Sequence, residues 1–163
     1  FGEVHSDFQN FNINDKKLME PYMRILEESN LPIVIHSSEP VGHIYPGKGS
    51  TTPEKLLKII EYFPKNIFVL SHWGGGLFFY ELMPEIAKSL KNVFYDCSAS
   101  PLLYDSRIYE IALKIIDSKK LLFGSDFPLI EPSRITKYID NLEIDKKQLD
   151  NIYWKNAKNI LSV

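Results

Sequence analysis

The stretch Ile67-Phe-Val-Leu-Ser-His-Trp-Gly-Gly-Gly76 decides the fold, because an apolar run ends there abruptly in a histidine, a tryptophan and three glycines. Residues 67–70 are too few for a helix and too uniformly apolar for a half-exposed strand, so they predict a strand buried on both faces of a parallel sheet. His72 then lies at the carboxyl end of that strand, where parallel α/β folds gather their ligands. We expect the three glycines to leave room there for a substrate.

Strands of this kind alternate with helices along the whole chain. Residues 31–36 form a second apolar run, which ends in His36, and further strands are expected at residues 1–5, 92–97 and 121–126. The ends of successive strands lie roughly 30 residues apart, the size of one βα unit. Apolar periodicity and breaks at proline and asparagine predict helices at residues 16–29, 52–63, 79–90, 105–118, 133–141 and 146–161.

The first predicted helix is amphipathic, and its apolar face is expected to pack on the rest of the domain. Five residues share that face: Leu18, Met19, Tyr22, Ile25 and Leu26. Helices of this kind between buried strands make parallel α/β the predicted fold class.

Two architectures fit the alternation, an open doubly wound sheet and a (β/α)8 barrel. A doubly wound nucleotide-binding sheet is expected to carry a glycine-rich turn after its first strand, and no such turn follows residues 1–5. Strand after strand instead ends in a histidine or a carboxylate. We therefore predict a partial (β/α)8 TIM barrel, about strands four to eight with their helices. Residues 1–163 would be one barrel domain without its three amino-terminal βα units.

The composition excludes several classes of protein. With 44% hydrophobic and 25% charged residues, the chain has enough apolar material for one sizeable globular domain. The net charge of −2 gives no reason to expect nucleic acid or a membrane surface as a partner. No apolar run approaches the length of a membrane span. The single cysteine, Cys97, cannot form an internal disulfide, which agrees with a cytoplasmic location.

Three strand ends carry side chains that suit a metal site. His36 and His72 occupy equivalent positions on two strands, and Asp126 ends the last strand in Phe123-Gly-Ser-Asp-Phe-Pro128. Two imidazoles and a carboxylate are a common ligand set for zinc and similar metals. The alternatives are histidines that are merely hydrogen-bonded at the sheet edge, and an Asp126 that caps the next helix. Glu3 and His5 share one face of the first strand, and their role stays open.

The loop at residues 37–52 gathers polar side chains that suit substrate contact. Such density in a loop favours binding over packing, although a solvated loop is the alternative for His43 and Lys48. Trp73, next to His72, is assigned to the same role. The predicted substrate-binding residues are Glu39, His43, Tyr45, Lys48 and Trp73.

The motifs at four strand ends resemble the amidohydrolase-related branch of the metal-dependent amidohydrolase superfamily, which includes aminocarboxymuconate semialdehyde decarboxylase. They are Gly2-Glu-Val-His5, Pro32-Ile-Val-Ile-His36, Leu70-Ser-His-Trp-Gly-Gly75 and Phe123-Gly-Ser-Asp-Phe-Pro128. The resemblance implies that His36, His72 and Asp126 bind a divalent metal, with Zn²⁺ as the expected ion. It also implies that His72 and Asp126 are catalytic.

The chain departs from the family pattern at two places. The paired histidines of the family's first strand have no counterpart here, and the fourth-strand position that carries a lysine in binuclear members reads Glu3-Val4-His5. A mononuclear site is therefore expected.

The expected function is hydrolysis of an amide, ester or lactone bond of a small molecule by metal-activated water. The alternative within the family is decarboxylation of a small unsaturated or aromatic acid, and the alternative of another class is a non-catalytic fragment or binding module. Because three strands would be missing, we also expect a homo-oligomer or association through exposed sheet edges.

Overall fold

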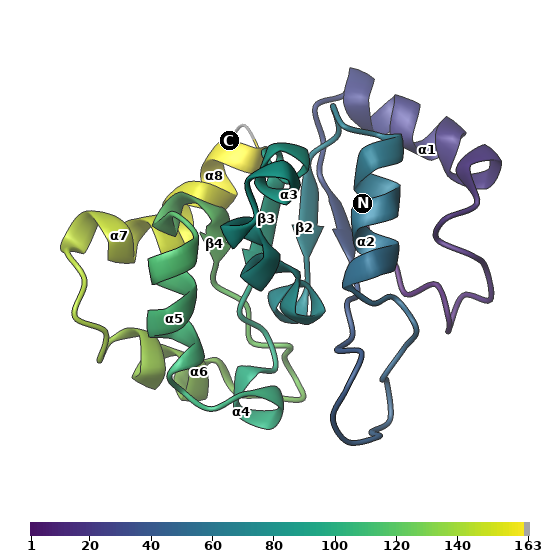
Figure 1. Cartoon of the computed structure of the whole chain (residues 1–163). Coiled ribbons are helices and arrows are strands. Elements are labelled where there is room, and N and C mark those ends of the chain that lie inside the picture. Colours follow the sequence, from purple (N-terminus) through teal and green to yellow (C-terminus); the bar gives the residue numbers. More distant parts are fainter. Residues whose placement is uncertain (162–163) are drawn as a thin grey trace.

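A computed structural model describes residues 1–161 and shows a parallel sheet of four strands. The strands follow one another across the sheet in the order β1-β2-β3-β4, and every neighbouring pair is parallel (Figure 1). In a doubly wound sheet the order in which strands are added reverses at a switch point, whereas a barrel adds each new strand on the same side of the one before. The order therefore confirms a barrel-type α/β fold. The strands are β1 (Ile33–Ile35), β2 (Phe68–Leu70), β3 (Val93–Asp96) and β4 (Leu121–Leu122).

The strand predicted at residues 1–5 is reduced to a single bridge. Val4 pairs in parallel with Ile35, and the backbone N–H of Val4 donates to the carbonyl of Val34 over 2.8 Å. This segment nevertheless runs along the free edge of β1. It therefore carries Glu3 and His5 to the edge of the sheet.

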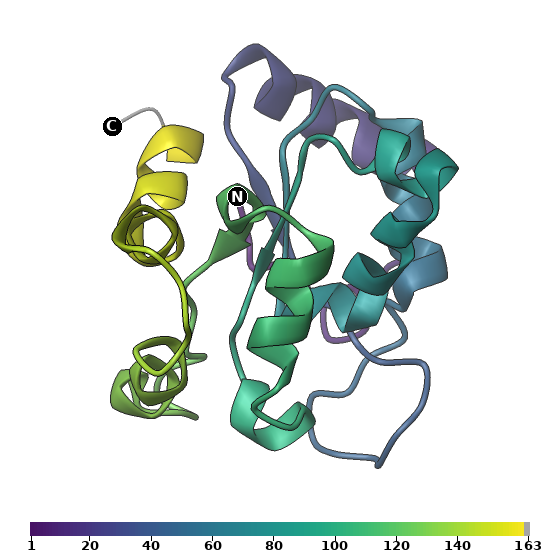
Figure 2. The same ribbon diagram turned by 60° about the vertical axis from the view of Figure 1, so that its left-hand side comes forward.

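Both faces of the sheet are buried, as the apolar run at residues 67–70 predicts. Alternate strand residues, such as Phe68 and Leu70, belong to the main core with the helices. The residues between them, Val69 and Leu122, pack in a second cluster that includes Ile160 of the last helix. Figure 2 shows the carboxyl-terminal helices, in yellow, on one side of the sheet and the amino-terminal helices, in purple and blue, on the other.

Most helices begin at a residue that suits a helix start. The Asp15 side chain accepts the N–H of Leu18, and Asp145 and Gln148 form a capping box. Proline occupies the first turn of α2, α3, α4 and α6. The α-helices are α1 (Lys16–Glu28), α2 (Pro53–Tyr62), α3 (Pro84–Ser89), α4 (Ser100–Leu103), α5 (Ile108–Ile115), α6 (Pro132–Ile139), α7 (Lys146–Asp150) and α8 (Asn156–Leu161).

Two helix predictions need correction. The helix predicted at residues 79–90 begins only at Pro84, because proline cannot donate the hydrogen bond that a helix interior needs. The preceding segment is the 3₁₀ element η1 (His72–Leu82). The short helix α4 was not predicted. The last predicted helix is divided into α7, the π-helical turn η3 (Asn151–Lys155) and α8, and the short 3₁₀ turn η2 (Ser118–Lys120) precedes β4.

The buried face of α1 matches the predicted one only in part. Met19 and Leu26, both predicted, are buried together with Met23. Leu18, Tyr22 and Ile25 are instead 42%, 47% and 56% exposed. The helix is apolar over more than one face, so periodicity alone did not identify the side that packs.

The glycines after β2 make room for the protein itself and not for a substrate. Residues 72–76 all have positive φ, from 55° at His72 to 92° at Gly76. A Cβ at Gly75 would overlap the backbone of Ser38, and one at Gly74 would lie 3.1 Å from the ring of Tyr95. This left-handed run lets the chain turn sharply against the neighbouring loop. The expected clearance for a substrate is therefore wrong.

No helix among residues 1–161 is long and apolar enough to cross a membrane.

Substitution by alanine should separate the two reasons for glycine after β2, which are a positive φ and the close approach of other atoms. Gly76 has a positive φ, but nothing lies closer than 3.7 Å to its Cβ position, so Gly76→Ala should lower the free energy of unfolding by about 1–2 kcal/mol. Gly75→Ala adds the overlap with Ser38 and should cost about 1–3 kcal/mol more. Urea unfolding of both variants measures the difference. Equal losses would contradict the close approach at Gly75.

Candidate metal centre

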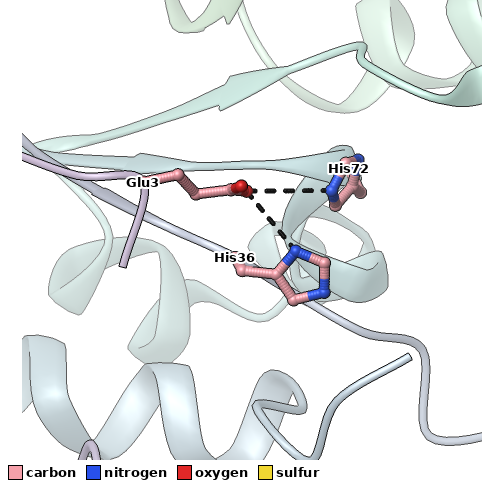
Figure 3. Close-up of side chains that lie close together, drawn as sticks. All are labelled: Glu3, His36 and His72. Carbon is pink, nitrogen blue, oxygen red and sulfur yellow. Dashed lines mark ion pairs between the residues drawn. The ribbon is translucent and has the colours of Figure 1, made fainter. Parts of the chain in front are cut away.

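Glu3, His36 and His72 converge at the carboxyl end of the sheet (Figure 3). Glu3 comes from the edge segment, and the two histidines follow β1 and β2. Glu3 Oε1 lies 3.4 Å from His36 Nδ1 and 3.8 Å from His72 Nε2. One ligand atom from each of the three residues lies within 4.8 Å of the other two. Ligand atoms about 2.1 Å from a tetrahedral ion lie about 3.4 Å apart, so this set fits a metal ion.

The Glu3 carboxylate is held in its ionised form. Burial alone would raise its pKa, but hydrogen bonds from His36 and Ser71 and the charges of His36 and His72 together lower the pKa to about 2. Because this lies below the ordinary value of 4.5, the interaction stabilises the folded state above about pH 4.5. That stabilisation is lost as the pH falls toward 2. A carboxylate that stays ionised is a ready ligand for a divalent cation.

The imidazole rings are fixed from the sides that face away from Glu3. His5 stacks on His36 with ring centroids 4.0 Å apart, and His36 meets His72 edge-on at 4.9 Å. His36 Nε2 lies 3.3 Å from Ser38 Oγ, and His72 Nδ1 lies 2.9 Å from Ser98 Oγ. Hydrogen bonds to the outer nitrogens of ligand histidines set the orientation of their rings.

A pocket of about 340 Å³ opens beside the histidines. This volume suits a small molecule. Figure 1 shows that the long loop after β1 and α4 project from the same end of the sheet. The walls are largely apolar, with polar groups at a few points. The lining residues are His36, His43, Tyr45, Pro46, Gly47, His72, Ala99, Leu102, Leu103, Asp126 and Leu129.

Asp126 lies in the wall of this pocket, but not in the group formed by Glu3 and the histidines. It is exposed and has a φ of 69°. Among residues 1–161, the group of possible ligand atoms that lie within 4.8 Å of one another consists of Glu3, His36 and His72. Asp126 does not belong to it. The assignment of Asp126 as a metal ligand stays a prediction, and its place on the pocket wall agrees with a role beside the substrate.

Two of the five predicted substrate-binding residues line the pocket, namely His43 and Tyr45. Glu39 lies behind them and accepts a hydrogen bond from the Tyr45 hydroxyl over 3.3 Å. Burial and the nearby Glu39 charge raise the pKa of Tyr45 to about 12, so this phenol stays protonated and can donate. Lys48 is not in the lining, because its Nζ donates to the carbonyls of Val41 and His43 and ties the loop together.

Trp73 is a core residue, which corrects its predicted assignment to substrate binding. Its side chain is 0% exposed, and its ring meets Tyr109 edge-on with centroids 5.2 Å apart. The indole Nε1 donates to Ser100 Oγ over 2.7 Å. The left-handed backbone of η1 turns the ring away from the pocket and into the helix layer.

Glu3 is the site residue that sequence reasoning did not assign. The available signal was that Glu3 and His5 share one face of the first strand. The structure separates their roles: the Glu3 carboxylate reaches both histidines, whereas His5 stacks on His36 and its Nε2 lies 3.1 Å from the carbonyl of Gly47.

A barrel-type sheet with a carboxylate and two imidazoles at its carboxyl end is an arrangement that could hold a metal ion in a barrel protein. The family model described as "Amidohydrolase" matches residues 2–163, and the chain belongs to this family. None of the curated proteins matches the chain.

The fold is shared by several solved structures, including the following three. The first is 5-carboxyvanillate decarboxylase from Sphingomonas paucimobilis, with 15% identity and a TM-score of 0.73 over 94% of this chain and 56% of that one. A dihydroxybenzoic acid decarboxylase from Polaromonas sp. JS666, with bound manganese and the inhibitor 2-nitroresorcinol, has 18% identity and a TM-score of 0.66, covering 86% and 52%. An uncharacterised TIM-barrel protein from Bordetella bronchiseptica has 18% identity and a TM-score of 0.67, covering 93% and 52%. The chain thus has the fold of part of a TIM barrel and spans little more than half the length of these proteins.

Removal of the Glu3 charge should weaken metal binding. We expect Glu3→Gln to lower the affinity for Zn²⁺ by at least about tenfold, because the replacing amide oxygen is neutral. Calorimetric titration at about pH 8 of Glu3→Gln beside Glu20→Gln, an exposed control on α1, measures the change in affinity. An unchanged affinity in Glu3→Gln would exclude Glu3 from the site.

Proposed function

We propose that this chain forms the catalytic part of a metal-dependent enzyme that decarboxylates a small aromatic or unsaturated acid. The observation that carries the proposal is the convergence of Glu3, His36 and His72 at a pocket of about 340 Å³. The family match supports an amidohydrolase-type site. The names of two structures with the same fold support decarboxylation in particular.

Glu3, His36 and His72 would hold one divalent ion, and two imidazoles with a carboxylate favour zinc. When bound, the ion would act as a Lewis acid toward an oxygen of the substrate. Manganese, which one similar structure contains, is the other ion to test.

Residues of the pocket wall can supply the remaining functions, which are substrate contact and proton transfer. Leu102, Leu103 and Leu129 offer an apolar surface for a flat ring. Tyr45 donates its hydroxyl proton to Glu39, and its oxygen can accept a hydrogen bond from a hydroxyl of the substrate. Asp126 lies in the pocket wall and is exposed to solvent, so it can take a proton from water and pass it to the carbon that loses carbon dioxide.

Hydrolysis of an amide, ester or lactone bond is the second candidate. The same three residues would hold the ion, and Asp126 would accept the proton of the attacking water. The observation that favours this reaction is the membership of the amidohydrolase family.

An activity assay on the purified chain separates the candidates. With Zn²⁺ or Mn²⁺, we expect release of carbon dioxide from 2,6-dihydroxybenzoate or 5-carboxyvanillate, and no release after the metal is removed. Asp126→Asn should slow the reaction by at least about 100-fold, because it removes the proton-transfer group. Cleavage of p-nitrophenyl acetate instead would favour hydrolysis. If the chain binds metal and the acid but catalyses neither reaction, it is a binding module and not the proposed enzyme.

A further inference from the structure

His72 makes different contacts with its two ring nitrogens. Nε2 faces Glu3 Oε1 at 3.8 Å, on the side where a metal would bind. Nδ1 faces away from it and lies 2.9 Å from Ser98 Oγ and 3.4 Å from the carbonyl oxygen of Ser98. The ring is buried, with 5% of the residue exposed, so water does not compete freely for these contacts.

The single proton of the Ser98 hydroxyl is not available for a hydrogen bond to His72. Ser98 Oγ donates a hydrogen bond to Asp96 Oδ1. A hydroxyl has one proton, so toward His72 the serine can only accept. The carbonyl oxygen of Ser98 can also only accept. Both contacts therefore require a proton on His72 Nδ1.

Asp96 is itself held in place by the backbone. Its Oδ1 accepts the N–H of His72 over 3.1 Å and the N–H of Ser98 over 2.9 Å. Asp96 ends β3, next to the strand that carries His72. The carboxylate therefore connects the ends of two neighbouring strands and orients the Ser98 hydroxyl between them.

Gly124 leaves the space that this arrangement occupies. A Cβ at position 124 would lie 3.3 Å from Asp96 Cβ, Asp96 Cγ and Ser98 Cβ. The φ of Gly124 is not in the left-handed region, so the backbone itself would accept another residue. The reason for glycine at this position of Phe123-Gly-Ser-Asp-Phe-Pro128 is thus the packing of Asp96 and Ser98.

The contact on His36 differs in this respect. Ser38 Oγ accepts the N–H of Gly49 over 2.9 Å and interacts with the Tyr45 hydroxyl, and its own proton can also point at His36 Nε2, 3.3 Å away. Ser38 can therefore donate to the imidazole or accept from it. The tautomer of His36 is not determined by its serine, whereas that of His72 is.

We propose that Ser98 and Asp96 are positioning residues that keep His72 in the Nδ1–H tautomer and direct the lone pair of Nε2 at the metal site. Gly124 makes this arrangement possible by leaving room for both side chains. The inference rests on the proposed metal site for its purpose, but the tautomer is a property of the metal-free chain. A ligand histidine that is preset in this way binds metal without first moving a proton between its nitrogens.

Nitrogen NMR of the metal-free chain tests the tautomer directly. Long-range ¹H–¹⁵N spectra at about pH 8 distinguish a protonated from an unprotonated ring nitrogen, and His72→Asn assigns the His72 signals. We expect Nδ1 protonated and Nε2 unprotonated. The opposite pattern would overturn the inference. If the expected tautomer is found but the wild-type chain binds no Zn²⁺, the proposed function fails and the positioning role stands.

Matched variants test the consequence for metal binding. Ser98→Ala removes the hydroxyl and should weaken Zn²⁺ binding by about 10–100-fold, with a smaller population of the Nδ1–H tautomer. Ser98→Thr retains a hydroxyl and should recover most of the affinity. Gly124→Ala should resemble Ser98→Ala in both measurements. Equal affinity and an unchanged tautomer in Ser98→Ala and the wild type would contradict the proposal, provided that circular dichroism shows both to be folded.

Discussion

The arrangement of the candidate site depends on one carboxylate, that of Glu3, which two buried imidazoles share. His36 and His72 are 7% and 5% exposed, and their inner nitrogens both face Glu3 Oε1. Polar groups at such depth require partners, because their interaction with water has been lost. The edge segment that carries Glu3 therefore does more than extend the sheet. It supplies the negative charge that makes the two histidines a candidate cation site.

The sheet brings these groups together through its order of strands. Because β1 and β2 are parallel neighbours in register, His36 and His72 follow the same end of adjacent strands. β3 continues the pattern and delivers Asp96, which holds Ser98 against the far side of His72. The residues that face the candidate metal site and the residues that support them thus come from consecutive βα units. This is how a barrel concentrates chemistry at one end.

The sequence predicted those parts of the fold that depend on local patterns. The apolar run at residues 67–70 identified a strand buried on both faces, and the regular alternation identified the α/β class. His36 and His72 could be selected because each ends such a strand. Other features depend on contacts between distant residues. The exposure of Tyr22 on α1 and the burial of Trp73 depend on which side of each element packs, and apolar character does not decide that.

Glu3 and Asp126 illustrate the same limit within the site. Both are carboxylates near strand ends, and Asp126 had the more distinctive sequence around it. The distance of a side chain from two histidines depends on the path of the backbone around it, which a motif does not specify. Gly124 is similar, because its neighbours Asp96 and Ser98 lie more than twenty residues away in the chain.

Anomalous X-ray diffraction from crystals of the chain grown with Zn²⁺ tests the central claim most directly. A peak about 2.0–2.2 Å from Glu3 Oε1, His36 Nδ1 and His72 Nε2 is the predicted result. A fourth ligand from Asp126 or from solvent would be compatible with it. Zinc bound elsewhere on the chain, or a peak that His72 and Glu3 do not contact, would contradict the account.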